Sequence, residues 1–368
     1  MAQTIEQILG GINLCGVIQA TTTGIPDVWE PGFYEGVETV NGDTGAYTRI
    51  TGTRTTARIA AYGSPSQQRQ LKDIARIPAK LIHSIESIYH NPAVLTNLLN
   101  YNNLSVQRLG IAEVARQTKE FRQNFDNLRI ATLTSMLATG GISFDGSGNF
   151  LPSTTGASFT ISYGVPTNNT GQLMLNGTNT IITSSWTNTT GVNMFNQLAQ
   201  LKKYARQITG YPVERAYYGA NVIDYVLGQG TVKSFLDHNP TANEHVKEYG
   251  TIPDRFAGIE WRPAADAFFE DANGSNQPLW DDDTILFCPK PSAEWIGWLE
   301  GTYPIPSSVY GNVSSDGAAA MNTLSLVTGM FSYGMVLSDP VTVKQVAGDT
   351  FLPVLKVPKA IFIAKVKF

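Results

Sequence analysis

The clearest hydrophobic pattern in the chain lies between Ser105 and Thr139, where apolar and small side chains recur at spacings of three and four residues. They are Ile111, Val114, Thr118, Phe121, Phe125, Leu128 and Thr132. This spacing places them on one face of an α-helix. Leu104-Ser105 offers an N-terminal cap and Gly140-Gly141 a stop. The pattern therefore predicts a helix of about 33 residues, roughly 50 Å long.

A different pattern, rich in Thr with scattered apolar positions, runs from Gly36 to Tyr62. Asn41-Gly42-Asp43 within it is typical of a hairpin turn, so the segment predicts a long two-stranded excursion. An isolated two-stranded hairpin is only marginally stable in water, and a neighbouring subunit is the natural candidate for its support. Residues 1–35 show no sustained period, and we expect an extended arm that ends near the Pro31-Gly32 turn.

The rest of the chain predicts short strands and further helices. Ile142-Ser143-Phe144 and Phe159 to Tyr163 predict β hairpins after the long helix. Between Val192 and Tyr333, helices expected near 192–208 and 220–237 alternate with short strands, which indicates a separate α+β domain. The expected strands lie at 215–218, 284–288 and 295–299, and later at 341–343, 351–356 and 361–366. The last three should rejoin the helix-bearing domain.

Length and composition narrow the class of protein. With 368 residues, the chain can bury more than one core, because single cores stop growing near roughly 250 to 300 residues. Charged residues make up 15% of it, against the roughly 25% typical of soluble domains. The chain is 42% apolar, so it is folded, and much of its surface need not repel other copies. Its 26 basic residues form no dense run, which argues against sequence-specific nucleic-acid binding.

Membrane and export signals are not expected either. No stretch approaches the roughly 20 apolar residues that span a bilayer, so no membrane association is expected. The first cationic side chain is Arg49, so we expect no basic leader for secretion. The two cysteines, Cys15 and Cys288, are too few for a disulfide framework and fit a reducing cytoplasm.

Candidate chemical groups are few. His83 and His90, like His238 and His245, are seven residues apart, but no cysteine or compact carboxylate set completes four metal ligands. Asp281-Asp282-Asp283 lacks the alternating ligands of a calcium loop. The chain has no nucleophile elbow, phosphate-binding loop or zinc-protease motif. We therefore expect no catalytic, cofactor or metal site and no enzyme. An unrecognised site using His238 or Asp281 to Asp283 stays open as an alternative.

Three arginines, Arg49, Arg54 and Arg58, stand in the excursion. Spaced arginines on an extended loop can pair with carboxylates on another surface, because the guanidinium group stays charged and offers a planar set of donors. They are our candidate intersubunit contacts. The alternative is that they only keep the loop soluble.

The order of arm, excursion, long helix, hairpins, α+β domain and closing strands resembles the Hong Kong 97-type (HK97-like) fold of tailed-phage capsid proteins. The resemblance covers essentially the whole chain. It is closer to the lambda-type (E-type) major capsid family, in which a hairpin and a Trp follow the long helix, as Phe159 to Tyr163 and Trp186 do here. The strand Gly258-Ile259-Glu260-Trp261 and the segment Met335 to Pro340 are also similar to that family.

This resemblance implies an α+β, HK97-like capsid protein in five segments. They are an N-terminal arm (1–35), an extended hairpin called the E-loop (36–72), a peripheral domain with the long spine helix (73–186), an axial domain (187–335) and closing strands of the peripheral domain (336–368). The implied function is to assemble the icosahedral head of a tailed double-stranded DNA phage. An encapsulin-like nanocompartment shell, built on the same fold, is the alternative.

The same resemblance implies the partners. They would be copies of the chain in hexamers and pentamers, a separate scaffolding protein, a portal, a decoration protein as a further candidate, and packaged DNA held without sequence specificity. The chain would reside in the virion capsid after assembly in the host cytoplasm.

One prediction concerns covalent cross-links. The phage that names the fold joins its subunits by Lys–Asn isopeptide bonds, which need an unprotonated Lys amine on the E-loop. Residues 36–71 contain no Lys, and arginine stays protonated, so it cannot be the nucleophile. Mature particles boiled in SDS with reductant should give one band near the 40.0 kDa of the chain. A ladder of covalent multimers would contradict this.

Overall fold

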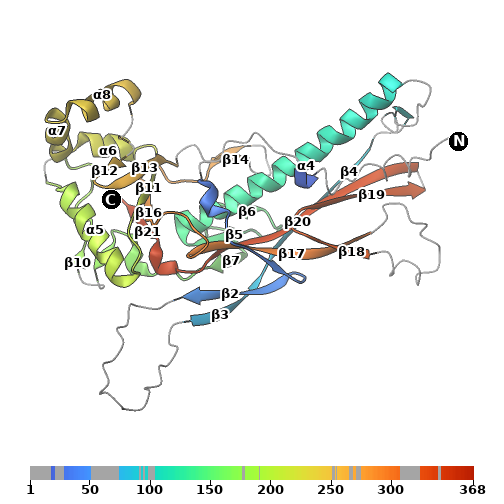
Figure 1. Cartoon of the computed structure of the whole chain (residues 1–368), viewed down its shortest axis with the longest axis horizontal. Coiled ribbons are helices and arrows are strands. Elements are labelled where there is room, and N and C mark those ends of the chain that lie inside the picture. Colours follow the sequence, from blue (N-terminus) through green and yellow to red (C-terminus); the bar gives the residue numbers. More distant parts are fainter. Residues whose placement is uncertain are drawn as a thin grey trace, which may run out of the picture.

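The computed structural model describes residues 18–20, 29–50, 74–90, 93, 96–97, 104–175, 179–189, 191–250, 253, 255–264, 268–270, 275–306, 324–338 and 341–368. Arg54 and Arg58, most of the predicted arm and the far part of the E-loop lie outside these residues. In the described chain, a long helix crosses one sheet, and a second sheet with shorter helices stands at the other end of the molecule (Figure 1).

The predicted long helix is confirmed as α4 (Leu104–Thr139). Gly140 follows it with φ +74° and donates its N–H to the Met136 carbonyl at 3.0 Å, so a left-handed glycine ends the helix as expected. The buried face holds Val114, Thr118, Phe121, Phe125 and Thr132. Ile111 was predicted to belong to it, but its side chain is 39% exposed, so the buried face begins at Val114.

The first sheet carries α4. Its strands are β1 (Val37–Val40), β17 (Ile296–Pro306), β18 (Leu324–Thr328), β19 (Phe331–Ser338), β20 (Val341–Leu355) and β4 (Ile82–Tyr89). The central strand β20 pairs antiparallel with β19 and β17 along one edge and with β4 along the other. The two strands expected at 341–343 and 351–356 are therefore one continuous strand, because partners on both sides hold it straight.

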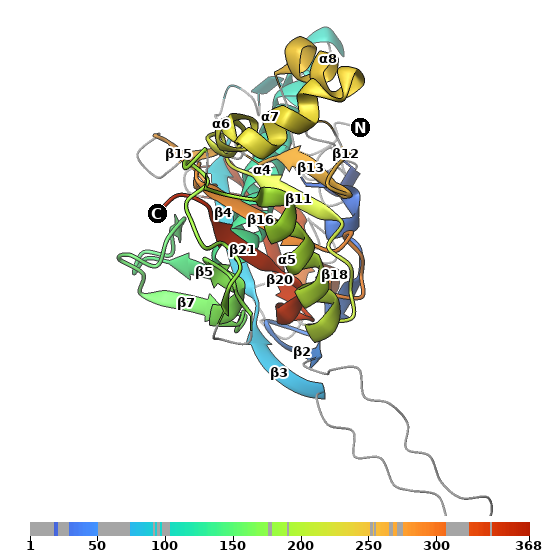
Figure 2. The ribbon, with the colours of Figure 1, turned by 90° about the vertical axis from the view of Figure 1, so that its left-hand side faces the viewer.

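The second sheet consists of β12 (Arg255–Phe256), β13 (Ile259–Pro263), β11 (Arg215–Tyr218), β16 (Thr284–Cys288), β21 (Phe362–Lys365) and β8 (Thr170–Gly171). Around it lie α5 (Met194–Ile208), α6 (Val222–Gly228), α7 (Gly230–Asp237) and α8 (Pro240–Tyr249) (Figure 2). The helix expected at 220–237 is split into α6 and α7 at Gln229, whose backbone is extended and whose buried side chain donates to the Trp186 carbonyl.

Smaller elements complete the described chain. β5 (Gly141–Phe144), β6 (Phe150–Leu151) and β7 (Phe159–Ser162) form an antiparallel sheet, which confirms the hairpins predicted after α4. Two short hairpins pair β9 (Met174–Leu175) with β10 (Asn179–Thr180), and β14 (Phe268–Glu270) with β15 (Asn276–Pro278). The 3₁₀ turns are η1 (Pro31–Phe33), η2 (Thr167–Asn169) and η4 (Pro358–Ala360).

The turn predicted at Asn41-Gly42-Asp43 exists, but it does not join a hairpin. Gly42 has φ +82°, and the chain changes partners there. β1 pairs in parallel with β17, whereas β2 (Thr44–Ile50) pairs antiparallel with β3 (Ile74–Lys80). The return leg of the excursion therefore reaches Lys80 rather than residue 72. The turn residues predict a change of direction, but they carry no information about which strand lies beside β1.

The two sheets do not follow the expected sequence segments. β17, β18 and the first part of β19 come from 187–335 but join the first sheet with α4. β21 comes from the closing segment 336–368 but joins the second sheet beside β16. The chain thus passes between the sheets several times. These pairings link distant residues, so no local pattern reports them.

The expected arm ends in buried structure rather than in an extended strand. Trp29 and Phe33 belong to the largest hydrophobic core, and the Trp29 indole N–H donates to Thr134 Oγ1 of α4 at 2.8 Å. Ile18 is fully buried against Phe121 and Phe125. Residues 18 and 29–33 therefore hold the N-terminal segment against the body of the molecule.

Truncation of the buried helix face tests this packing. Phe125 is 1% exposed, so Phe125→Ala should lower the free energy of unfolding by about 3 to 5 kcal/mol. Ile111→Ala on the exposed part of α4 is the matched control and should cost less than about 1 kcal/mol. Urea unfolding of the subunit measures both. Equal losses of unfolding free energy for the two variants would contradict the difference in burial between Phe125 and Ile111.

Candidate assembly interface

The root of the E-loop, formed by β2 and β3, is fixed to its own subunit. β2 and β3 pair over seven residues, from Thr44 opposite Lys80 to Ile50 opposite Ile74. Tyr47 is buried in the main core, where burial raises the pKa of its hydroxyl. The Ile50 N–H donates to the Lys356 carbonyl at 2.7 Å. Support from a neighbour, expected for an isolated hairpin, is not required for this described part of the loop.

Arg49 lies at this root. Its Nη2 donates to the Gly164 carbonyl at 3.1 Å, next to β7. Gly164 has φ +66°, and a Cβ there would stand only 2.8 Å from Nη2, so the guanidinium packs directly against the glycine. Arg49 therefore has a partner within its own chain. Arg54 and Arg58 lie outside the described residues, so the proposed contact of all three arginines with a neighbour stays a prediction.

A buried ion cluster attaches α4 to the first sheet. Arg129 of α4 donates through Nε and Nη2 to both oxygens of Asp349 on β20, at 2.7 and 2.8 Å, and through Nη1 to Glu300 on β17 at 2.9 Å. The Asp349 side chain is fully buried. The guanidinium carbon also lies 5.0 Å from the centre of the Phe351 ring. One arginine thus joins three elements.

The charges of this cluster depend on each other. Burial opposes the charge on Arg129, but Asp349 and Glu300 raise its pKa above the ordinary value. Burial raises the pKa of Asp349, and Arg129 opposes that shift. Removal of either partner would leave an uncompensated charge out of water, which costs several kcal/mol.

A second cluster ties the N-terminal segment to the second sheet. Glu30 accepts from Arg215 Nε at 2.6 Å and from the Tyr217 hydroxyl at 2.7 Å, both on β11. Burial acts to raise the pKa of Glu30, but these two hydrogen bonds lower it overall. Arg215 also pairs with Glu260 at 2.7 Å. The sequence offered no signal for this cluster, because a lone Glu between Trp29 and Pro31 belongs to no periodic pattern.

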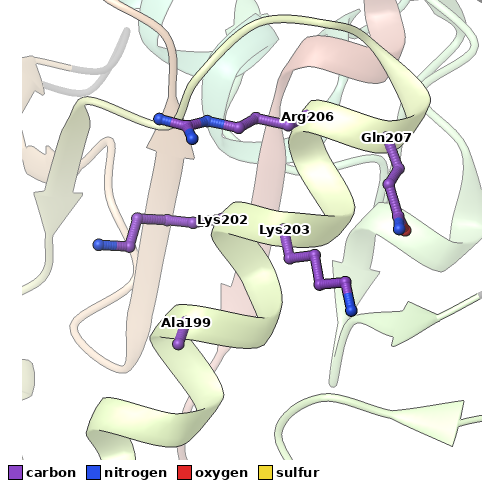
Figure 3. Close-up of a pocket in the computed structure, with 5 residues that line it drawn as sticks. All are labelled: Ala199, Lys202, Lys203, Arg206 and Gln207. Atoms are coloured by element: carbon purple, nitrogen blue, oxygen red, sulfur yellow. The ribbon is translucent and has the colours of Figure 1, made fainter.

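Three basic side chains extend from two sides of α5. Lys202, Lys203 and Arg206, with Ala199 and Gln207, border a shallow pocket of about 620 Å³ (Figure 3). Lys202 donates to the Ala257 carbonyl at 2.6 Å. The labelled side chains spread to both sides of the helix rather than converge on one point. The pocket has no carboxylate, thiol or hydroxyl in its lining, so it offers no acid–base or nucleophilic pair.

Two of the residues considered for an enzyme, His238 and Asp283, have hydrogen-bond partners within the chain. His238 Nδ1 lies 2.6 Å from the Ser234 carbonyl in its own helix. Asp283 accepts from Asn221 and from the Tyr225 hydroxyl at 3.0 and 2.8 Å. Burial acts to raise the pKa of Asp283, yet these bonds and Lys367 lower it overall. Within the described ranges, no group of three or more His, Cys, Asp or Glu side chains could hold a metal ion.

The described helices were also tested as membrane spans. None of them is both long enough and apolar enough to cross a bilayer. The longest, α4, carries charged residues such as Arg116, Glu120 and Arg129 along its length.

The family model of phage major capsid protein E matches residues 16–366. The chain belongs to this family of capsid-forming structural proteins, and the α+β, HK97-like fold expected from the sequence is confirmed. No curated protein sequence matches the chain significantly.

The chain is similar to several solved structures. A protein assigned as the capsid protein of an E. coli CFT073 prophage is 12% identical, with 100% of this chain and 99% of that chain covered and a TM-score of 0.53. The mature capsid of bacteriophage PhiM1 gives 9% identity, coverage of 94% and 89%, and a TM-score of 0.44. The holo-SrpI encapsulin complex of Synechococcus elongatus PCC 7942 gives 8%, 96% and 94%, and 0.40.

The Arg129 cluster generates a stability prediction. Arg129→Met should lower the free energy of unfolding by about 3 to 5 kcal/mol, because it leaves the buried Asp349 carboxylate unpaired. Arg116→Met is the control, since Arg116 makes only exposed pairs with Glu113 and Glu120 and should cost about 0 to 1 kcal/mol. Adding Asp349→Asn to Arg129→Met should recover part of the loss. Similar losses for Arg116→Met and Arg129→Met in urea unfolding would refute the buried cluster.

Proposed function

We propose that this capsid protein closes into the icosahedral head that encloses the double-stranded DNA genome of a tailed phage. The observation that carries the proposal is the family match over residues 16–366, which includes both sheets and α4. The described part of the structure is consistent with that role, because the E-loop root, β2 and β3, is anchored in the core of its own subunit. The low fraction of charged residues suits a surface that is mostly interface.

Within this head, the first sheet and α4 would form the peripheral domain, and the second sheet with α5 to α8 the axial domain. Copies would associate through the axial domain as hexamers and pentamers, which are closed rings of head-to-tail contacts. Residues 51–73 would reach a neighbouring subunit, and Arg54 and Arg58 would pair with its carboxylates. This assignment explains why the arginines stand on a loop whose root needs no further support.

The remaining partners follow from the same role. A separate scaffolding protein would guide closure in the host cytoplasm, a portal would occupy one vertex, and a decoration protein is a further candidate. Packaged DNA would meet the shell without sequence specificity, since contact with phosphates needs only scattered cations. The role requires no catalysis, so we propose that the chain is not an enzyme.

Expression with the scaffolding protein tests the function directly. Negative-stain microscopy and sedimentation should show closed shells of uniform size, because the chain provides the container wall. Only small soluble species from the complete pair of proteins would overturn the proposal.

The role of the far part of the E-loop can be tested separately. Ile50 and Ile74 face each other, so a short four-residue Gly/Ser loop can replace residues 51–73 and join β2 to β3. This variant should unfold like the wild type but form no shells. A control keeps the loop and carries Arg54→Ala and Arg58→Ala. Shell loss in the control assigns the contact to the arginines, and shells in both variants would contradict an assembly role for the loop.

A further inference from the structure

The outer edge of β4 has no partner in the described chain. All eight residues of β4 pair with β20, from Ile82 opposite Phe351 to Tyr89 opposite Lys344. In an antiparallel ladder, about half of a strand's N–H and C=O groups point away from that partner. No other described strand pairs with β4, and no backbone group outside the ladder hydrogen bonds to it. β4 therefore presents a row of unused donors and acceptors.

This edge also lacks the features that normally prevent pairing. Natural edge strands are short, bulged, or protected by Pro, Lys or other charges. β4 is regular over eight residues and contains no Pro, Gly or Lys. Its one formal charge, Glu86, turns toward α4 and accepts from Asn124 Nδ2 at 3.1 Å. On the opposite face Ile85 and Tyr89 are 45% and 59% exposed.

The space beside the edge is open. A groove of about 410 Å³ runs between β4 and α4, and its lining includes Glu86 and Ile88 on the strand and Gln117 and Asn124 on the helix. α4 therefore leaves room beside β4 instead of covering it.

We propose that β4 pairs antiparallel with β4 of a second copy, which joins two first sheets into one continuous sheet. The twofold axis would lie midway between the two copies of Ile85, and we call this an axis through Ile85. The inference rests on the proposed capsid function, because it assigns one of the contacts that assembly requires. Facing residues must point to the same side of the sheet, so the axis must pass through a residue rather than between two.

The register of the proposed pairing follows from the residues that would face each other when β4 pairs with its own copy. An axis through Glu86 would place two carboxylates against each other, which is destabilising. An axis through Ser84 or Ser87 would oppose Glu86 to Ile82 or Ile88. An axis through Ile85 avoids both problems. Its facing pairs would be Ile85 with Ile85, Ile82 with Ile88, Ser84 with Glu86, and His83 with Ser87.

This contact differs in kind from those of a hexamer or pentamer. Ring contacts join two different surfaces head to tail, whereas a twofold contact uses the same surface on both copies. The β4 pairing would therefore link subunits of adjacent rings. It would also remove two exposed sheet edges at once, which explains why the strand carries no protection of its own.

A single cysteine tests the register. Ile85→Cys, in a Cys15→Ser background that keeps the buried Cys288, would face its own copy at a Cβ separation of roughly 4.5 to 5.5 Å, close to disulfide range. Assembled shells oxidised with copper phenanthroline should yield mostly dimer on a non-reducing gel. Tyr89→Cys is the control, because it lies on the same face and is more exposed. Its two copies would stand about 27 Å apart at ~3.4 Å per residue and should stay monomeric.

Shells that form without an Ile85→Cys dimer, or with equal dimer from Tyr89→Cys, would overturn the pairing and leave the proposed function intact. A second variant covers the case in which the cysteine disturbs assembly. Ile85→Lys should abolish shells because two ammonium groups would face each other, while its half-exposed site leaves subunit unfolding unchanged. Ile85→Thr should still form shells. Normal shells from Ile85→Lys would also reject the pairing.

Discussion

The structure depends most on the way α4 is attached to the first sheet. Arg129 makes the polar part of that attachment, because it joins the helix to two strands. Hydrophobic packing by Phe121 and Phe125 holds the helix against β20. The Arg129 guanidinium donates to both oxygens of Asp349 on β20 and to Glu300 on the neighbouring strand β17. A buried ion group of this kind is a weak source of net stability, but removal of one partner is costly because it leaves a charge out of water.

A second polar link extends this order to the other end of the molecule. Glu30, just after the buried Trp29, binds Arg215 and Tyr217 on β11. Trp29 itself donates to Thr134 on α4, so one short N-terminal segment touches both α4 and the second sheet. Three polar contacts therefore connect the parts of the body: those made by Arg129, by Glu30 and by Trp29. A subunit held together in this way suits a capsid shell, because many copies must repeat the same contacts.

Local patterns predicted much of the fold and little of its connectivity. The helix face around Phe121 and Phe125 and the strands at 215–218 and 284–288 depend on near neighbours, so periodicity revealed them. The pairing of β1 with β17 and the continuity of β20 depend on distant partners. Arg129 lies 220 residues from Asp349 and 171 from Glu300, so no spacing could connect them. Of the candidate arginines, only Arg49 lies in the described chain, where it contacts Gly164 of its own subunit.

The central claim is that this chain is a capsid subunit in which α4 keeps the same attachment to the first sheet at every position of the shell. Cryo-electron microscopy of assembled shells, at a resolution that shows side chains, tests it most directly. The account predicts that subunits in five-neighbour and six-neighbour positions superpose over α4 and the first sheet, with the Arg129–Asp349 pair intact in each. Subunits in which α4 has shifted along β20, with that pair broken, would contradict it.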